Sequence, residues 1–583
     1  MPPTESNPQP ATGTPAVLER NVLALQRRAP ALLARLDLPA REDHLRAEPG
    51  GVGIDWRGTW QRLDLEAAAA DGATLDLAAR SGSRAEGSLL LFGVGLGETL
   101  ARALAGPATR ILAWDRDPRL LRLLIERLDL AEAIDGGRLE LLLGTDLLAW
   151  TGQQIPAQVR AHPILGSMWA RERRLVERGA VGRPIALGEG RLFVDQVGEC
   201  LERLGFWPWT VDIQGLAVEE IEHQVDALDP VALVTVNHTH GVAEFCSARG
   251  LPALTWEIDP STDSLARLER PCPTSHVFTY RRAHVDAFRA AGFEHVTYQP
   301  LAADTLARRP AQLAGAEAEH YRAPVAFVGA SMVERGRRAQ DQFLELYGAW
   351  ARDEGATDAS GRAALEQALA DQRGDFSRYR LATLLRPTFG KFLDDCAAEA
   401  EAGHSTLRPE SLAAEAAAAE KRLSWVGSLA SFDVQVWGDE GWKALEPHGV
   451  RYRGGAGHAL ELNRVYSGAS INVDIGRLYQ ADIVTMRVFD VLACGGFALV
   501  EASEALAECF AVGEELAVYR DLAELRAKIA HYLEHPDQAR AMAERGRAAV
   551  LERHDMTARL ASMLRSAGVD RGTGATDPEP AGA

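Results

Sequence analysis

Residues 485–501 combine side chains and backbone groups suited to hold a diphosphate. The run Met486-Arg-Val-Phe-Asp490-Val-Leu-Ala-Cys-Gly495-Gly496 predicts a short helix that ends at a glycine pair and precedes a strand. Unpaired N–H groups and a partial positive charge at the start of a helix attract an anion. Arg487 adds to that charge, and Asp490 is placed to accept hydrogen bonds from ribose hydroxyls. Gly495 and Gly496 permit close packing. The segment therefore predicts a site for a nucleoside diphosphate.

Other residues extend this candidate donor site. Gly329 ends a predicted strand and precedes a group of arginines, Arg335, Arg337 and Arg338, whose alternative role is a solvated helix face. Arginine side chains offer a planar fork of donors that suits the negative charge of a diphosphate. Asp482 precedes Asp490 and is a second candidate for a ribose or sugar contact. Tyr452-Arg453-Gly454 follows a strand-like segment, and the family resemblance described below implies that its backbone groups hold the base.

A candidate catalytic base lies in the middle of the chain. Asn237-His238-Thr239-His240-Gly241 follows one predicted buried strand, and Asp259 ends another. A carboxylate or an imidazole at such a position can accept the proton of a hydroxyl acceptor. We favour Asp259 over His240, because Trp256 and Pro260 would fix its loop. The two histidines lack an evident third ligand, so no metal site is predicted.

A glycine triplet in the first part of the chain indicates a Rossmann-type nucleoside site. Gly93, Gly95 and Gly97 follow a predicted strand, Asp115 ends the next strand, and Asp146 follows a third. The triplet alone is a weak signal, and the two acidic residues strengthen it. The pattern is similar to that of S-adenosylmethionine-dependent methyltransferases. Two interpretations stay open: a structural or acceptor-recognition domain, which we favour, and an active methyltransferase that binds S-adenosylmethionine.

Strands and helices alternate along the chain, which is typical of doubly wound parallel sheets and predicts an α/β fold. Predicted strands include 89–92, 111–114, 139–143, 210–213, 233–236, 253–256, 276–279, 296–299, 325–329, 434–437, 470–473 and 497–501. We expect three Rossmann-like domains, at 16–185, 186–320 and 321–566, with a helical insertion at 337–428. The ends, 1–15 and 567–583, are rich in Pro, Gly and Thr and are predicted to be disordered.

Composition excludes several classes of function. The net charge of −19 over 583 residues argues against nonspecific nucleic-acid binding, which requires neutralisation of phosphates. The six cysteines form no C-x-x-C pair, so reduced structural thiols are expected. No apolar run approaches the roughly 20 residues of a membrane helix, and no signal peptide is visible, so we expect a cytoplasmic protein without a transmembrane segment.

The 485–495 segment resembles the corresponding part of the CgeB-like (spore-maturation) glycosyltransferases, which have the GT-B fold of two facing Rossmann-like domains. The element Glu515-Leu-Ala-Val-Tyr519-Arg-Asp521 and the run from Cys246 through Gly250-Leu-Pro to Trp256 and Asp259 are similar to that family, as is Leu301-Ala-Ala-Asp304. The chain departs from the pattern in having aspartates at 482 and 490 and Thr485 in place of an asparagine. The first block resembles the methyltransferase-like Rossmann domain of motility-associated flagellin glycosylation proteins.

These resemblances imply a metal-independent glycosyltransferase that needs no cofactor. It would move a sugar from a nucleotide-diphosphate sugar to a hydroxyl acceptor, either Ser or Thr of a surface protein such as flagellin or a glycan. Two alternatives remain: a bifunctional methyltransferase–glycosyltransferase, and a catalytically inactive scaffold that binds nucleotide sugars. An NAD-dependent dehydrogenase fits less well, because it leaves two further domains without a role.

Overall fold

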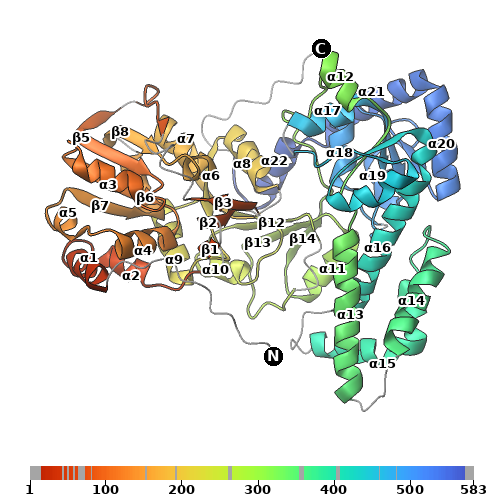
Figure 1. Ribbon diagram of the computed structural model, residues 1–583, viewed down its shortest axis with the longest axis horizontal. Helices are drawn as coiled ribbons and strands as arrows, with labels where there is room; N and C mark the ends of the chain where they lie inside the picture. The colour runs from red at the N-terminus through yellow and green to blue at the C-terminus, as the bar shows by residue number, and fades with distance from the viewer. Residues whose placement is uncertain are drawn as a thin grey trace. The chain divides into compact units, whose positions relative to one another are not determined.

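The computed structural model describes residues 15–41, 45–48, 51–56, 59–63, 73–80, 82–151, 154–190, 193–259, 265–353, 360–401, 408–457, 460–480 and 482–570 (Figure 1). The ends predicted to be disordered lie outside these residues, apart from Pro15 and residues 567–570. The chain divides into two compact units. Unit 1 is Met1–Val236, Cys246–Leu254 and Leu564–Asp577, and unit 2 is Asn237–Phe245, Thr255–Met563 and Pro578–Ala583.

Unit 1 begins with helices that precede a parallel sheet of Rossmann type. The sheet has the strand order β4-β8-β5-β6-β7, in which only β4 is antiparallel to its neighbour. Its central strand ends in the buried run Leu89–Phe92, as expected for a strand covered on both faces. The elements are α1 (Pro15–Arg28), α2 (Pro30–Leu36), β4 (Ala73–Thr74), β5 (Ser83–Phe92), α3 (Glu98–Ala105), β6 (Arg110–Asp115), α4 (Pro118–Arg127), α5 (Ala131–Asp135), β7 (Leu139–Leu143), β8 (Gln154–Ala161), α6 (Leu165–Met168) and α7 (Ala170–Arg178).

A small antiparallel sheet, not predicted from the sequence, has the order β1-β2-β3. Its strands are β1 (Leu45–Glu48), β2 (Gly51–Trp56) and β3 (Thr59–Arg62). Strand β2 carries Trp56 at its end, beside the loops of unit 1 that follow β6 and β9.

A second parallel sheet has the order β10-β9-β11-β12-β13-β14, which reverses direction at its first strand, β9. The division between the units passes through its strands. The elements are β9 (Arg183–Gly188), α8 (Val194–Arg203), β10 (Phe206–Val211), α9 (Val218–Leu228), β11 (Leu233–Val236), α10 (Val242–Ala248), β12 (Ala253–Glu257), β13 (Ser275–Thr279), α11 (Arg282–Ala290) and β14 (His295–Tyr298). Strand β9 spans residues 185 and 186, where the sequence placed a domain boundary.

The third parallel sheet lies in unit 2 and has the order β17-β16-β15-β18-β19-β20, the order of the Rossmann fold. Its elements are α12 (Gly315–Tyr321), β15 (Ala323–Val328), β16 (Val434–Trp437), β17 (Arg451–Tyr452), α17 (Leu460–Gly468), β18 (Ala469–Asp474), α18 (Met486–Ala493), β19 (Ala498–Glu501), α19 (Glu504–Cys509), β20 (Ala517–Tyr519), α20 (Leu522–Glu534), α21 (Pro536–Arg553) and α22 (Met556–Ser566). The predicted α/β class with doubly wound parallel sheets is therefore confirmed.

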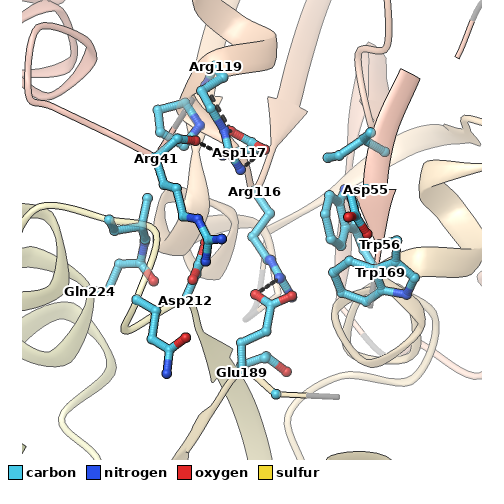
Figure 2. A pocket seen from close by; sticks show the side chains of 16 residues that line it. Arg41, Asp55, Trp56, Arg116, Asp117, Arg119, Trp169, Glu189, Asp212 and Gln224 are labelled. Carbon is cyan, nitrogen blue, oxygen red and sulfur yellow. Dashed lines mark hydrogen bonds and ion pairs between the residues drawn. The ribbon is translucent and has the colours of Figure 1, made fainter. Parts of the chain in front are cut away.

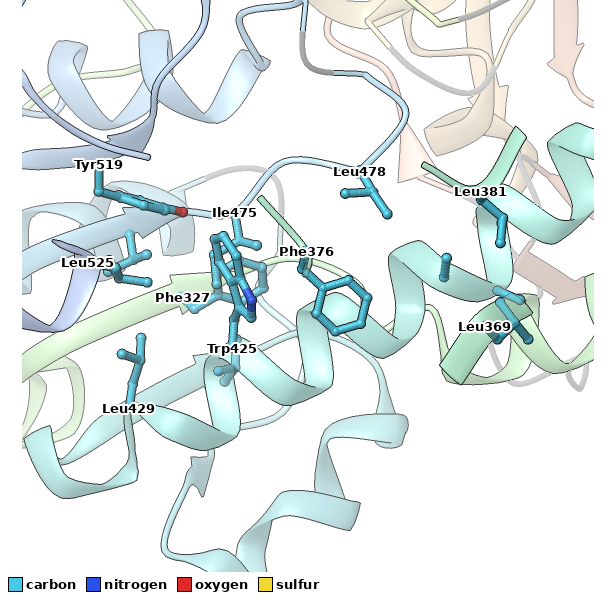
Figure 3. Packing of buried hydrophobic residues seen from close by; sticks show 14 of the residues in the cluster. Phe327, Leu369, Phe376, Leu381, Trp425, Leu429, Ile475, Leu478, Tyr519 and Leu525 are labelled. Carbon is cyan, nitrogen blue, oxygen red and sulfur yellow. The ribbon is translucent and has the colours of Figure 1, made fainter. Parts of the chain in front are cut away.

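Four helices between β15 and β16 form the predicted helical insertion. They are α13 (Val333–Asp353), α14 (Ser360–Arg373), α15 (Leu381–Glu401) and α16 (Pro409–Ser428). Helix α16 belongs to the domain of the third sheet, because its apolar face forms part of the core of that sheet. Figure 3 shows Trp425 of α16 packed among Phe327, Ile475 and Tyr519, in one continuous buried cluster. This packing fixes the position of α16 against the sheet.

Candidate active site

The carboxyl ends of β15 and β18 mark the point where the third sheet changes direction. Strands β15 and β18 are neighbours in the sheet, although their paired first residues, Ala323 and Ala469, lie 146 positions apart in the chain. Ligands of doubly wound sheets bind outside the carboxyl ends of strands at such a point. Gly329 follows β15, and Asp474 is the last residue of β18.

Arg487 lies at this edge, as the sequence predicted for a donor-site residue. Its guanidinium donates to the Asp474 carboxylate and lies 5.0 Å from the centroid of the Phe327 ring. A Cβ atom at Gly329 would lie 2.7 Å from Nη2 of Arg487. Glycine at 329 therefore makes room for the arginine. The Arg487 side chain remains 15% exposed and is not enclosed in the core.

The start of α18 has backbone N–H groups that no side chain caps. Thr485 holds the N-cap position, but its hydroxyl donates to Asp474 over 2.9 Å and does not cap the helix. The first N–H groups of a helix have no partner within the helix. The helix start is thus suited to an anion, and Arg487 stands in its first turn.

Sequence reasoning missed two basic residues of α16, Lys421 and Arg422. Lys421 is buried and pairs with Glu501 at 2.6 Å. Arg422 is 7% exposed, and its Nη1 donates to the Ala330 carbonyl over 2.9 Å. No carboxylate bonds to Arg422, and its buried Nε has no hydrogen-bond partner among the described residues. Burial, with the neighbouring guanidiniums of Arg487 and Arg477, lowers the pKa of Arg422 to about 9.

The sequence did contain a signal for Arg422. Ala418, Trp425, Val426 and Leu429 are buried and recur at helical spacing, and Arg422 falls on the same face. A charged residue on the apolar face of a helix is rarely buried unless it is paired or serves a ligand.

Arg335 and Arg477 lie in a second part of the site, near Glu415. Arg335 donates to Glu415 over 2.7 Å, and Arg477 donates to the Tyr479 hydroxyl over 3.2 Å. The other two arginines of the predicted group, Arg337 and Arg338, pair with Glu334 on an exposed helix face, which is the alternative that the sequence left open.

We name Arg335, Arg422, Arg477 and Arg487 the arginine cluster. Four guanidiniums stand against two carboxylates in direct contact with them, Glu415 and Asp474. Such an excess of positive charge, partly desolvated, suits a ligand with two negative charges better than a neutral one.

Asp259 lies within electrostatic reach of this cluster in unit 2. Burial raises the pKa of its carboxyl, and the charges of Arg477 and Arg335 oppose that rise. The Asn237 side chain accepts the N–H groups of Ile258 and Asp259 at 2.9 and 3.0 Å and fixes the loop after β12. The predicted contribution of Pro260 lies outside the described residues.

The two histidines of the Asn237–Gly241 loop differ in environment. His240 is exposed. His238 packs edge-on against Phe288 and Phe293, and burial lowers its pKa. Asp259 is therefore better placed than His240 to act in a partly enclosed site.

A buried cluster supports the Asp259 loop and was not foreseen. Glu257, the last residue of β12, is fully buried and accepts from the Thr279 hydroxyl. The Nδ1 atom of His284 lies 3.0 Å from both carboxylate oxygens of Glu257. Because Glu257 is inaccessible, we assign this cluster to positioning of the β12 end.

Asp482 and Asp490 contact arginines of the chain itself. Asp482 forms a two-pronged ion pair with Arg281 at 2.6 and 3.0 Å. Asp490 is buried and accepts from Nε of Arg308 over 3.0 Å. The ribose or sugar contacts predicted for these carboxylates would have to share or replace those partners.

The predicted glycines occupy different places. A Cβ at Gly496 would lie 2.6 Å from the Tyr466 carbonyl oxygen, so Gly496 allows close packing. Helix α18 ends at Ala493, about 12 Å from its start at 1.5 Å per residue, and both glycines follow that end, so neither lies beside Arg487. Gly454 has open space where a Cβ would stand, and its carbonyl accepts from Gly438 N–H. Arg453 donates to the Gln435 side chain over 2.8 Å.

In unit 1 the glycine triplet and Asp115 are brought together, but side chains fill the space before the glycines. A Cβ at Gly95 would lie 2.5 Å from Nε2 of His162, and one at Gly93 2.8 Å from Leu165; at Gly97 it would meet Leu124. The buried Asp115 carboxylate accepts the N–H groups of Val94 and Asp117. Asp146 pairs with Arg35. The glycines thus serve close packing in the described structure.

His162 predicts a measurable pH dependence. Its Nδ1 accepts two backbone N–H groups at 3.2 Å, and burial lowers its pKa to about 4. The unfolded chain therefore takes up a proton near pH 6.5 that the folded chain resists, so stability falls as the pH drops from 6.5 to 4. Relative to His162→Asn, which keeps an acceptor, wild type should lose about 2–3 kcal/mol over this interval in urea unfolding. His448→Asn, at an exposed site, is the control and should follow wild type. Parallel curves for wild type and His162→Asn would contradict the assignment.

The part of the chain that the structure describes has neither a metal-binding cluster nor a membrane-spanning helix. No group of three or more His, Cys, Asp or Glu side chains is arranged to hold a metal ion. None of the described helices combines the length and apolar character of a membrane span. The six cysteines are free thiols, five of them buried.

Comparison with known proteins gives one family match. Residues 414–565, which begin within α16 and end within α22, match the family described as glycosyl transferase-like. No curated protein matches the chain. Three solved structures cover 66% of this chain. They are a glycosyltransferase from Rickettsia africae ESF-5 (10% identity, 97% of its chain, TM-score 0.38), Alr3699/HepE of Anabaena with UDP and glucose (10%, 100%, 0.36) and sucrose-phosphate synthase of Thermosynechococcus elongatus (13%, 98%, 0.34).

The TM-scores of these three structures lie below 0.5, so the assignment rests on the family match. That match contains three members of the arginine cluster, Arg422, Arg477 and Arg487. Over residues 414–565 the chain is therefore similar to the glycosyl transferase-like family.

Proposed function

We propose that the protein transfers a sugar from a nucleoside diphosphate sugar to a hydroxyl acceptor. The observation that carries this proposal is the arginine cluster at the switch point of the third sheet, within a glycosyl transferase-like domain. Transfer leaves a nucleoside diphosphate whose negative charge grows as the bond to the sugar breaks. Positive groups held in place before the reaction stabilise that charge.

Each residue of the donor site has a separate role. Arg487 and the uncapped N–H groups of α18 bind the diphosphate, and Arg422 adds a desolvated charge from α16. Asp474 and Phe327 hold Arg487 in place. Since the cluster itself supplies several positive charges, we propose that the reaction needs no metal ion.

Asp259 is the proposed base. Its raised pKa makes the carboxylate a stronger proton acceptor than an exposed aspartate. Asp259 takes the proton of the acceptor hydroxyl as that oxygen attacks the anomeric carbon, and the bond from this carbon to the diphosphate oxygen breaks. The acceptor class, Ser or Thr of a protein or a glycan, remains part of the proposal, as does the CgeB-like subfamily.

A thermal-shift panel tests donor binding. UDP-, GDP- and dTDP-sugars contain a diphosphate, whereas a CMP-sugar has one phosphate and serves as the internal contrast. We expect at least one diphosphate donor to raise Tm in EDTA and to be hydrolysed slowly. A shift without hydrolysis or transfer would indicate an inactive scaffold. A shift only with the CMP-sugar, or with none of the donors, would exclude the proposed donor site.

Arg422→Met gives opposite effects on stability and binding. Removing a buried cation that lacks a carboxylate partner should leave Tm of the free protein unchanged or higher. Loss of a charged hydrogen bond to the diphosphate should weaken donor binding about 10- to 100-fold, from roughly 1.5–3 kcal/mol. Calorimetry and thermal unfolding measure the two effects.

Arg338→Ala, at an exposed site on α13, is the control for Arg422→Met and should change neither quantity. Unchanged donor affinity in Arg422→Met would remove this residue from the site and leave Arg487 to be tested separately.

A further inference from the structure

Unit 1 contains a cavity of about 120 Å³ that the transferase reaction does not use. It lies where strands of two parallel sheets end (Figure 2). Arg116 follows β6, Glu189 follows β9, and Asp212 follows β10, while Trp56 ends β2. Carboxyl ends of parallel strands are where doubly wound sheets bind ligands.

The arginines of this cavity are bound to carboxylates of the chain. Arg116 is 8% exposed and pairs with Glu189 and, at 3.4 Å, with Glu172. Arg119 contacts both oxygens of Asp117, at 2.7 and 2.5 Å. A phosphate would have to displace these partners to form the paired contacts that arginine makes with anions.

The charge of the lining also disfavours an anion. Three arginines line the cavity, against four carboxylates, those of Asp55, Asp117, Glu189 and Asp212. In this respect the cavity differs from the arginine cluster of unit 2, where guanidiniums outnumber the carboxylates that contact them. An uncharged ligand meets no such repulsion.

Aromatic rings form one wall. The Arg116 guanidinium lies 4.2 Å from the ring centroid of Trp169 and 5.3 Å from that of Trp56, and the two rings meet edge to face at 5.0 Å. Figure 2 shows Arg116 between these tryptophans and the side that carries Arg41 and Asp212. The indole N–H of Trp169 is buried and has no hydrogen-bond partner among the described residues.

The polar groups of the lining offer both kinds of hydrogen bond. Carboxylates accept, guanidiniums donate, and the amides of Gln214 and Gln224 do both. A sugar ring matches this mixture, because its hydroxyls donate and accept while its C–H faces pack on aromatic rings.

We propose that this cavity binds one uncharged saccharide residue, either as a free sugar or as the end of a glycan. The Trp56 ring contacts its C–H face, and Asp212 accepts from its hydroxyls. The site is separate from the donor site and does not depend on the transferase activity.

Saturation-transfer NMR on the full-length protein tests the site with methyl glycosides of neutral hexoses. At least one glycoside should bind, and Asp212→Asn should weaken it about tenfold or more. Trp56→Ala should also weaken binding, so the test does not depend on one variant. Asp226→Asn, at an exposed carboxylate of the same unit, is the matched control and should bind as wild type does.

Additional binding measurements distinguish an anion site from a saccharide site and a free sugar from a glycan. Inorganic phosphate should not compete with the glycoside, and Arg487→Ala should leave glycoside binding intact, which keeps this test apart from that of the donor site. An oligosaccharide with the same terminal residue should bind more tightly if the natural ligand is a glycan, and no more tightly if it is a free sugar. Absence of binding for every glycoside, competition by phosphate, or equal binding by wild type, Asp212→Asn and Trp56→Ala would overturn the proposal.

Discussion

Replacing Asp259 by Asn should reduce the rate of sugar transfer about 10²- to 10⁴-fold, the range of general base catalysis. The amide keeps the size of the side chain but cannot take the acceptor proton. Donor affinity should change little, because Asp259 interacts with Arg477 and Arg335 only through their charges and forms no ion pair with them among the described residues. Single-turnover transfer rates, with donor affinity from calorimetry, measure the two quantities separately.

The pH dependence of transfer provides a second readout for Asp259. Burial raises the pKa of this carboxyl, so protonation disables the base at a higher pH than for an exposed aspartate. The wild-type rate should therefore decline as the pH falls through this raised pKa, and the Asn variant should lack that limb. His240→Asn is the comparison, since His240 was the other predicted base. If His240→Asn abolishes transfer while Asp259→Asn does not, the roles are reversed.

Arg487→Ala should lower kcat/KM about 10²- to 10³-fold, because it removes a preorganised hydrogen-bond donor that stabilises the negative charge growing on the departing diphosphate. Arg487→Lys should restore only part of the activity, since an ammonium cannot keep both the contact with Asp474 and the planar packing on Phe327. Steady-state kinetics and donor calorimetry measure the loss of activity and of donor affinity. Binding of the CMP-sugar should not change in this variant.

Gly329→Ala is a matched structural test of the same residue. Its Cβ would stand 2.7 Å from Nη2 of Arg487 and should displace the guanidinium without removing it. We expect a smaller loss of activity than in Arg487→Ala, with Arg338→Ala unchanged. Normal activity of Arg487→Ala would show that the donor does not depend on Arg487, and this result would contradict the proposed site.

Much of the fold could be predicted from the sequence. Apolar runs such as 139–143, 233–236 and 434–437 coincide with β7, β11 and β16, because strands buried on both faces are continuously hydrophobic. Strand β9 was missed, since Arg183-Pro-Ile-Ala-Leu-Gly188 begins with a charged residue and contains a proline. Strand β10 lies earlier than predicted, at Phe206–Val211.

The candidate site was predicted only in part. Arg487 stands where the sequence placed it, at the start of a helix after β18. Arg308 pairs with Asp490 across 182 residues, and Arg281 with Asp482 across 201 residues. Ion pairs between such distant residues leave no periodic signal along the chain, so nothing local could reveal them.

The sequence by itself determined the alternation of strands and helices and the helix that carries Arg487, because both depend on residues close together in the chain. Tertiary structure decided which charges meet. It placed Arg422 of α16 beside a sheet edge formed by β15 and β18, and it filled the space before Gly95 with His162. Burial and contact between distant segments set these outcomes, and neither is a property of a local pattern.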